Sequence, residues 1–145
     1  MTLSDIVPTI VTLLKGSELL STLEILTNAD ESYNTRLEQA LREKGVALVV
    51  VQSAGELKDK KSPLLYLVNS VMVTVLENPA TNETGTSALG IVEEVLRQVH
   101  GAQWKTQKGL QNRYTVDTPA YEMGPLDGGL ITYFCNFHIL TIHEN

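Results

Sequence analysis

The longest apolar stretch without a helical period runs from Pro63 to Glu77. Its alternate residues form two sets, and both sets are mostly apolar, which predicts a β-strand buried on both faces. At about 3.3 Å per residue the stretch spans roughly 50 Å, whereas a compact domain of this length is about 40 Å across. We therefore expect the strand to bend or to overhang the body, with a bend or bulge at the polar neighbours Asn69 and Ser70.

Further apolar runs also predict strands. Val46–Val51 is a continuous, mostly β-branched run that is too short for a helix, which is typical of an interior strand. Leu130–His143 is apolar in both alternating sets and predicts a second strand of unusual length, preceded by a tight turn at Asp127–Gly129. Two shorter strands, Arg113–Asp117 and Tyr121–Met123, are expected on either side of a proline.

Helical spacing begins near the N-terminus. Ile6–Leu14 carries a broad apolar stripe, with Asp5 as the expected N-cap and Gly16 as the expected end. The next segment, Ser17–Thr27, fits either a helix or a strand, and we expect a strand near its end.

A second helix is expected over Asp30–Lys44, because Asn28 and Glu31 have the spacing of a capping box and Gly45 follows the last turn. Its apolar face is thin, so most of its surface should contact solvent.

The most regular amphipathic pattern of the chain predicts a third helix between Ser87, as N-cap, and Gly101, as stop. We expect it to lie across the sheet. Its expected inward side chains are Ala88, Leu89, Val92, Val95, Leu96 and Val99.

The order of these elements predicts an α+β fold, a mainly antiparallel β-sheet with helices packed on one face and long β-hairpins. The segment Ala54–Ser62 is expected to be a projecting hairpin connection between two of the strands, and Ala102–Gln111 a second loop. With 145 residues, no dividing linker and no internal repeat, residues 1–145 should form one domain.

The charge, hydrophobicity and cysteine content of the chain argue against several classes of protein. The formal net charge of -6 argues against autonomous or sequence-specific nucleic-acid binding, which normally needs a basic patch. No run approaches the length of a membrane span and no leader pattern precedes the first helix, so we expect a soluble protein that does not bind membranes. The single cysteine, Cys135, excludes a disulfide within one subunit and fits a reducing compartment.

Basic side chains gather in the two expected loops, and an indole lies in the second of them. We interpret these residues as a candidate partner interface. The alternatives are solvated loop charge for the lysines and an anchor folded onto its own core for the indole. The candidate interface residues are Lys58, Lys60, Lys61, Trp104, Lys105 and Lys108.

No catalytic or metal-binding signature is present, so we expect a protein that is not an enzyme and binds no cofactor. Gly85–Gly90 begins like a phosphate-binding loop, but Ile91 and Val92 stand where lysine and serine or threonine are required. In a regular strand Cys135 and His138 point to opposite faces and cannot form a nucleophile–base pair. We interpret His138 as a hydrogen-bonded structural histidine.

The element order resembles that of bacteriophage tail terminator proteins, also called tail completion or minor tail proteins. The resemblance rests on the N-terminal helix, a strand pair and three passages: LEQALREKGVALVVV at Leu37–Val51, ALGIVEEVLRQVHG at Ala88–Gly101 and YEMGPLDGGLITYFCNFHILTI at Tyr121–Ile142. It implies a non-enzymatic structural subunit that assembles with copies of itself into a ring, often a hexamer. Such a ring caps the tail tube and joins it to the head connector, in the virion tail, after assembly in the bacterial cytoplasm.

The residues add one independent argument. Two overlong strands, apolar on both faces, need more cover than about three helices provide, and neighbouring subunits of a ring can supply it. Two alternatives stay open: a stand-alone protein-binding module or small inhibitor that uses the two loops, and a head-side connector or stopper ring.

Overall fold

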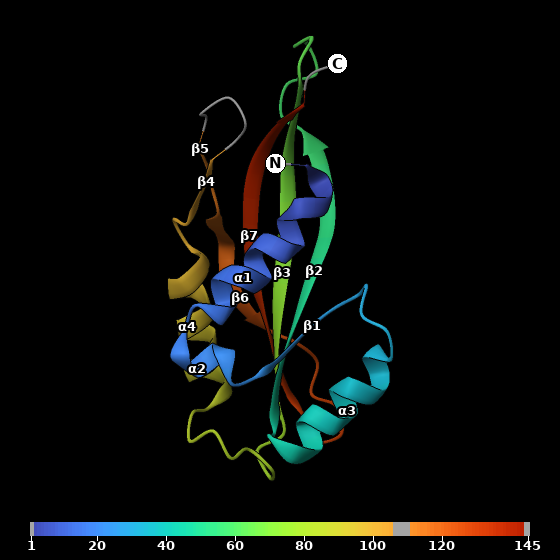
Figure 1. Ribbon diagram of the computed structural model, residues 1–145, viewed down its shortest axis with the longest axis vertical. Coiled ribbons are helices and arrows are strands. Elements are labelled where there is room, and N and C mark those ends of the chain that lie inside the picture. The colour runs from blue at the N-terminus through green and yellow to red at the C-terminus, as the bar shows by residue number, and fades with distance from the viewer. Residues whose placement is uncertain (1, 106–110, 144–145) are drawn as a thin grey trace.

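A computed structural model describes residues 2–105 and 111–143. Its main sheet has five strands in the order β1-β2-β3-β7-β6 (Figure 1). β1 pairs in parallel with β2 and every other pair in this sheet is antiparallel, so the predicted α+β class with a mainly antiparallel sheet is confirmed. The strands are β1 (Glu24–Thr27), β2 (Val46–Leu57), β3 (Leu65–Glu77), β6 (Thr115–Met123) and β7 (Ile131–His143).

The two long strands, β3 and β7, are neighbours in the sheet. β3 pairs with β7 along its whole length and with β2 on its other edge, so it is an interior strand of the sheet. A register shift is present, but it lies in β2 between Gln52 and Ala54, next to Ser70, rather than in β3 itself. β2 also continues to Leu57, so the expectation of a loop from Ala54 onward was wrong, and the connection spans only residues 58–64.

Three helices, α1 (Ile6–Lys15), α2 (Glu18–Ser21) and α4 (Ala88–Val99), cover what we call the first face of the sheet. Figure 1 shows α1 running across the strands in front of the sheet. The first-face side chains of the strands that form the main core are Val46, Leu48, Val50, Val71, Val73, Val75, Cys135, Phe137 and Ile139.

The buried stripe of α4 differs from the predicted one by part of a turn. Val95 is buried as expected, but Leu89 is 48% exposed and Leu96 only half-buried, while Ile91 is fully buried. The sequence pattern allows a buried face that includes Leu89 and Leu96 or one that includes Ile91, because apolar residues occupy more of this helix than one face can bury. Ser87 caps the helix as predicted, since its hydroxyl accepts a hydrogen bond from a backbone amide of the first turn at 3.4 Å.

The helix α3 (Tyr33–Glu43) lies on the opposite face, which we call the second face. Ala40 and Leu41 pack there against Ala47 of β2, with Leu76 and Leu130 partly buried beside them. The expectation that the helices share one face was therefore wrong for α3. This helix forms the crossover between the parallel strands β1 and β2, and the handedness of such a crossover decides which face its helix covers.

Asp5 does not cap α1 through its side chain, contrary to the prediction. It stands at the N-cap position but also ends a short 3-10 helix, η1 (Leu3–Asp5), and makes no side-chain hydrogen bond to the first turn of α1. Its carboxylate accepts from the Thr2 amide at 2.8 Å instead. The carboxylate therefore closes the turn that precedes α1. An aspartate side chain can bond to either turn, and the preference of aspartate for N-cap positions does not decide between them.

The start of α3 was also predicted too early. Asp30 accepts a hydrogen bond from the Thr27 amide at 2.7 Å, and this turn precedes the helix. α3 begins only after Ser32, so the capping box predicted at Asn28 and Glu31 does not form its N-terminus.

A small antiparallel pair, β4 (Gln103–Lys105) and β5 (Gln111–Arg113), begins within the second expected loop and ends beyond it. Tyr114 separates β5 from β6, so the predicted strand Arg113–Asp117 is divided there. The Tyr114 ring is fully buried, and its hydroxyl donates to the Ile6 carbonyl oxygen at 3.1 Å. This tyrosine joins the start of β6 to α1.

Candidate functional site

The β2–β3 connection carries three of the predicted interface residues. Lys58, Lys60 and Lys61 are all exposed, and the Lys61 amide donates to the Asp59 carboxylate at 2.9 Å. The connection lies at one extreme of the long axis of the molecule, beyond the ends of β2 and β3 (Figure 1). These lysine side chains can therefore contact a partner without any change in the core.

Two of the other predicted interface residues, Trp104 and Lys105, belong to β4. Trp104 pairs through its backbone with Asn112, and Lys105 pairs with Gln111. Lys108 lies outside the described residues. In Figure 1 the β4–β5 pair is in the same half of the molecule as the β2–β3 connection, so the two candidate regions approach the same end.

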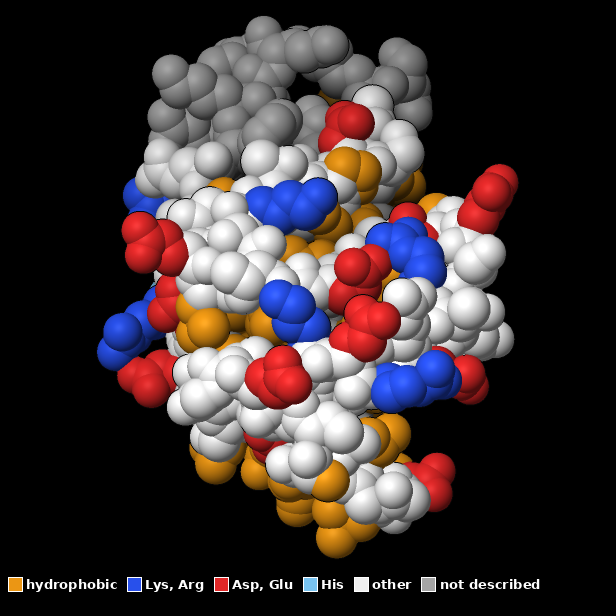
Figure 2. Space-filling view, turned by 60° about the horizontal axis from the view of Figure 1, so that its bottom comes forward, with side chains coloured by type: hydrophobic (Ala, Val, Ile, Leu, Met, Phe, Trp, Pro, Cys, Tyr) orange, Lys and Arg blue, Asp and Glu red, His pale blue; other side chains and the backbone are white. Residues whose placement is uncertain are grey.

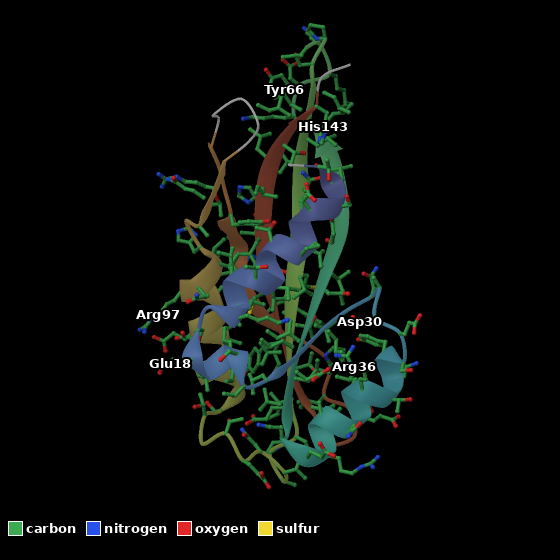
Figure 3. The ribbon with its side chains drawn as sticks, in the orientation of Figure 1. Glu18, Asp30, Arg36, Tyr66, Arg97 and His143 are labelled. Atoms are coloured by element: carbon green, nitrogen blue, oxygen red, sulfur yellow. The ribbon has the colours of Figure 1, made fainter. Side chains whose placement is uncertain are left out.

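Exposed leucines accompany the lysines at this end. We call the group Leu3, Leu57, Leu64 and Leu65 the hairpin-end leucines, and all four are exposed. Tyr66 and His143, on β3 and β7, are labelled at the same end in Figure 3. Apolar side chains flanked by charges are typical of a surface that binds another protein.

A second exposed apolar group lies at the opposite end of the sheet, where β6 stops and β7 begins. We call it the turn-end group, and its members are Leu89, Tyr121, Met123 and Leu126. Leu126 is 75% exposed in the β6–β7 turn, and the Tyr121 ring packs edge-on against Tyr133 at 6.0 Å between centroids. Figure 2, in which this end comes forward, shows hydrophobic side chains gathered at the lower edge of the view.

Sequence reasoning missed the turn-end group. It assigned Leu89 to the buried face of a helix and treated Tyr121–Met123 as an ordinary strand. The available signal was the run Gly124–Leu126, in which a leucine follows glycine and proline next to a tight turn. Among the described residues, the exposed large hydrophobic side chains belong either to the hairpin-end leucines or to the turn-end group.

The second face is only partly covered. α3 packs on it near Ala47 and Leu76, whereas the apolar residues farther along β3 and β7 remain half-exposed. The prediction that the sheet offers more apolar surface than its helices cover fits this arrangement. The half-exposed residues are Tyr66, Val68, Met72, Phe134, Leu140 and Ile142.

A polar cluster interrupts the second face where β6 lies beside β7. The His138 imidazole Nδ1 bonds to the Asp117 carboxylate, so the prediction of a hydrogen-bonded histidine is confirmed. Asp117 also lines a small cavity of about 280 Å³.

Asn136 makes the second link between these strands. Its Nδ2 donates to the Pro119 carbonyl oxygen at 3.1 Å and to the Glu122 carboxylate at 3.4 Å. These bonds hold β6 to β7 where their register shifts between Val116 and Tyr121.

Ser70 lies directly opposite His138 in the β3–β7 register, so serine, histidine and aspartate are neighbours here. These are the residue types of a hydrolase triad. Within the described ranges, however, no hydrogen bond joins the Ser70 hydroxyl to the imidazole, and the serine lies in the middle of a paired strand rather than on an exposed turn. The geometry fits a bridge between strands better than a nucleophile.

Cys135 belongs to the first-face core and is fully buried, on the side of the sheet away from Asp117 and His138. Burial raises the pKa of its thiol to about 12, which keeps the sulfur protonated and unreactive at neutral pH. Over residues 2–105 and 111–143, no group of three or more histidine, cysteine, aspartate or glutamate side chains is placed to hold a metal ion. No helix in these ranges is both long and apolar enough to span a membrane.

Neither a scan against protein-family models nor a search of curated proteins finds a match to this sequence.

Proposed function

We propose that this protein is a structural subunit of the tail terminator type, which forms a ring at the end of a phage tail tube and joins it to the head connector. The observation that carries the proposal is the division of exposed apolar side chains between two opposite ends of one elongated sheet. A terminator has two different partners, one above it and one below.

The two ends differ in chemistry. The hairpin-end leucines stand beside Lys58, Lys60 and Lys61, whereas the turn-end group includes a tyrosine, a methionine and the most exposed leucine of the two groups, Leu126. A two-fold dimer pairs one surface with the same surface of the other subunit. Two unlike surfaces on one subunit instead favour heterologous contacts, in which different surfaces meet. In a ring all subunits can then present the hairpin end to one partner and the turn end to the other.

Lateral contacts between subunits would use the half-exposed second face. Apolar residues such as Met72, Phe134 and Leu140 lie there beyond the reach of α3. Burial of apolar surface is the main favourable contribution to association between subunits, and stable interfaces cover roughly 800 Å² on each partner. The acidic net charge of -6 also suits a ring through which DNA must pass without binding.

The experiment that tests the proposal is tail assembly in the absence of this protein. Tails of abnormal length, or tails of normal length that fail to join heads, are the expected result. Fully normal infectious particles would exclude the role. Addition of the purified protein to the defective tails should restore head joining.

A further inference from the structure

One edge of the main sheet is left open where β1 ends. β1 pairs with β2 only from Ala47 to Val50, whereas β2 continues to Leu57. Past Val50, and among the described residues, β2 is paired only with β3, on its other edge. An unpaired edge of this length is a template for an additional strand.

One hydrogen bond shows which residues of β2 direct their backbone N–H and C=O groups to the open edge. The Lys58 amide donates to the Tyr66 carbonyl oxygen at 3.0 Å, so Lys58 points its backbone groups toward β3. Successive residues of a strand direct these groups to opposite edges. Gly55 and Leu57 therefore present their N–H and C=O groups to the open edge.

A groove of about 740 Å³ lies beside the same edge. Its walls are α1, the residues that follow β1, and the part of β2 from Gln52 to Gly55. Val7, Pro8 and Val11 of α1 form its apolar side, and every residue in its lining is uncharged. In a chain of net charge -6, an uncharged groove selects a ligand that is itself uncharged.

We propose that this edge binds an extended, uncharged segment of a partner protein as an added strand, with alternate apolar side chains of that segment inserted toward α1. The open backbone groups of Gly55 and Leu57 supply hydrogen bonds, and the groove supplies side-chain contacts. The inference does not depend on the proposed function, because it requires only an extended peptide.

A second copy of this chain is a poorer occupant. The other edge of the five-stranded sheet is β6, whose pairing is shifted between Val116 and Tyr121 and which contains Pro119. Proline has no N–H to donate, and the acidic residues Asp117 and Glu122 flank it. The β6 edge of a second copy therefore does not fit the groove, and we assign the groove to a segment of a different protein.

Amide exchange measured by NMR on the whole chain gives the first test. The Gly55 amide should exchange fast in the free protein and the neighbouring Glu56 amide slowly, since Glu56 points toward β3. A capped peptide of alternating threonine and valine is the probe. It should protect Gly55 and Leu57, and the same peptide with glutamate in place of valine should bind more weakly.

Two matched variants locate the binding site. Gln52→Lys places a charge in the groove and should weaken peptide binding about tenfold. Thr12→Lys adds the same charge to an exposed position of α1 outside the groove lining and should leave binding unchanged. The inference is overturned if the peptide fails to bind, if it protects β6 instead, or if Gly55 becomes protected at high protein concentration without peptide.

Discussion

Asn69 Nδ2 donates a hydrogen bond to Thr141 Oγ1 at 2.9 Å across the β3–β7 pair, where Asn69 is 1% exposed and Thr141 fully buried. The same amide nitrogen donates to the Ile139 carbonyl oxygen at 3.2 Å. The sequence draws attention to Asn69 as a polar residue within an apolar strand. Its role is to satisfy buried polar groups on the neighbouring strand, and β3 is not bulged there.

Replacement of Asn69 by alanine should lower the free energy of unfolding by about 2 kcal/mol, because the Ile139 carbonyl oxygen and the Thr141 hydroxyl lose a buried donor, although the Thr141 hydroxyl keeps its bond to His143 Nε2. Chemical denaturation measures this change. Asn136→Ala, which removes hydrogen bonds at a half-exposed position, is the matched control and should cost less than about 1 kcal/mol. Equal costs for the two variants would contradict this role for Asn69.

Val49 offers a test of the core on the second face. It lies in β2 between β1 and β3 and is 5% exposed, as the interior-strand prediction requires. Val49→Ala should cost on the order of 2 kcal/mol through lost transfer energy and a cavity. Val51→Ala, at a half-exposed position two residues along the same strand, should cost clearly less in the same denaturation experiment.

Stability should fall in alkaline solution. Burial raises the pKa of Tyr114 from its ordinary value of 10.0 to about 12, and burial raises the pKa of Cys135 from 9.0 to about 12. The folded state keeps these protons at a pH where the unfolded chain loses them, so their contribution is complete below about pH 9 and is lost as the pH rises through about 12.

The measurement is the free energy of unfolding between about pH 8 and about pH 12, read as a slope. Tyr114→Phe and Cys135→Ala each remove one of the two groups and should each flatten the decline. An unchanged slope in both variants would show that other groups cause the loss of stability.

The two ends of the molecule should be separable by mutation. Combined Lys58→Glu, Lys60→Glu and Lys61→Glu reverses the charge of the hairpin end. Met123→Asp with Leu126→Asp disrupts the turn-end group. All five side chains are exposed, so the fold and its melting temperature should change little. Each variant should abolish binding to one tail or head partner and keep the other.

Lys15→Glu, an exposed charge reversal at the end of α1, is the control for these variants and should keep both partners. Loss of both partners in either end variant, without loss of the fold, would contradict the assignment of one partner to each end.

Strand alternation was enough to predict the long strands, because a stretch such as Pro63–Glu77 has no competing helical period. The order of the elements then predicted the α+β class with a mainly antiparallel sheet. It could not place α3, since the face chosen by a crossover depends on chain handedness. The pattern also could not show that Ile91 rather than Leu89 is buried on α4, because the rotation of a helix about its own axis is set by its packing against the sheet.

Of the candidate binding surfaces, the sequence alone indicated the part that is formed by charged side chains. Lys58, Lys60 and Lys61 stand out in a polar loop and are exposed at a hairpin tip. The open edge of β2 has no counterpart in the sequence pattern, because it results from the early end of a neighbouring strand. Likewise, Ser70 and His138 are far apart in sequence, and only the register of β3 against β7 makes them neighbours.

Electron microscopy can show whether this protein assembles into a ring on the end of a tail. Tails assembled without this protein are incubated with the purified chain and imaged end-on and from the side. The proposal predicts a ring of subunits at one end of each tail, with head joining restored. Tails whose ends remain bare at saturating protein concentration would contradict it.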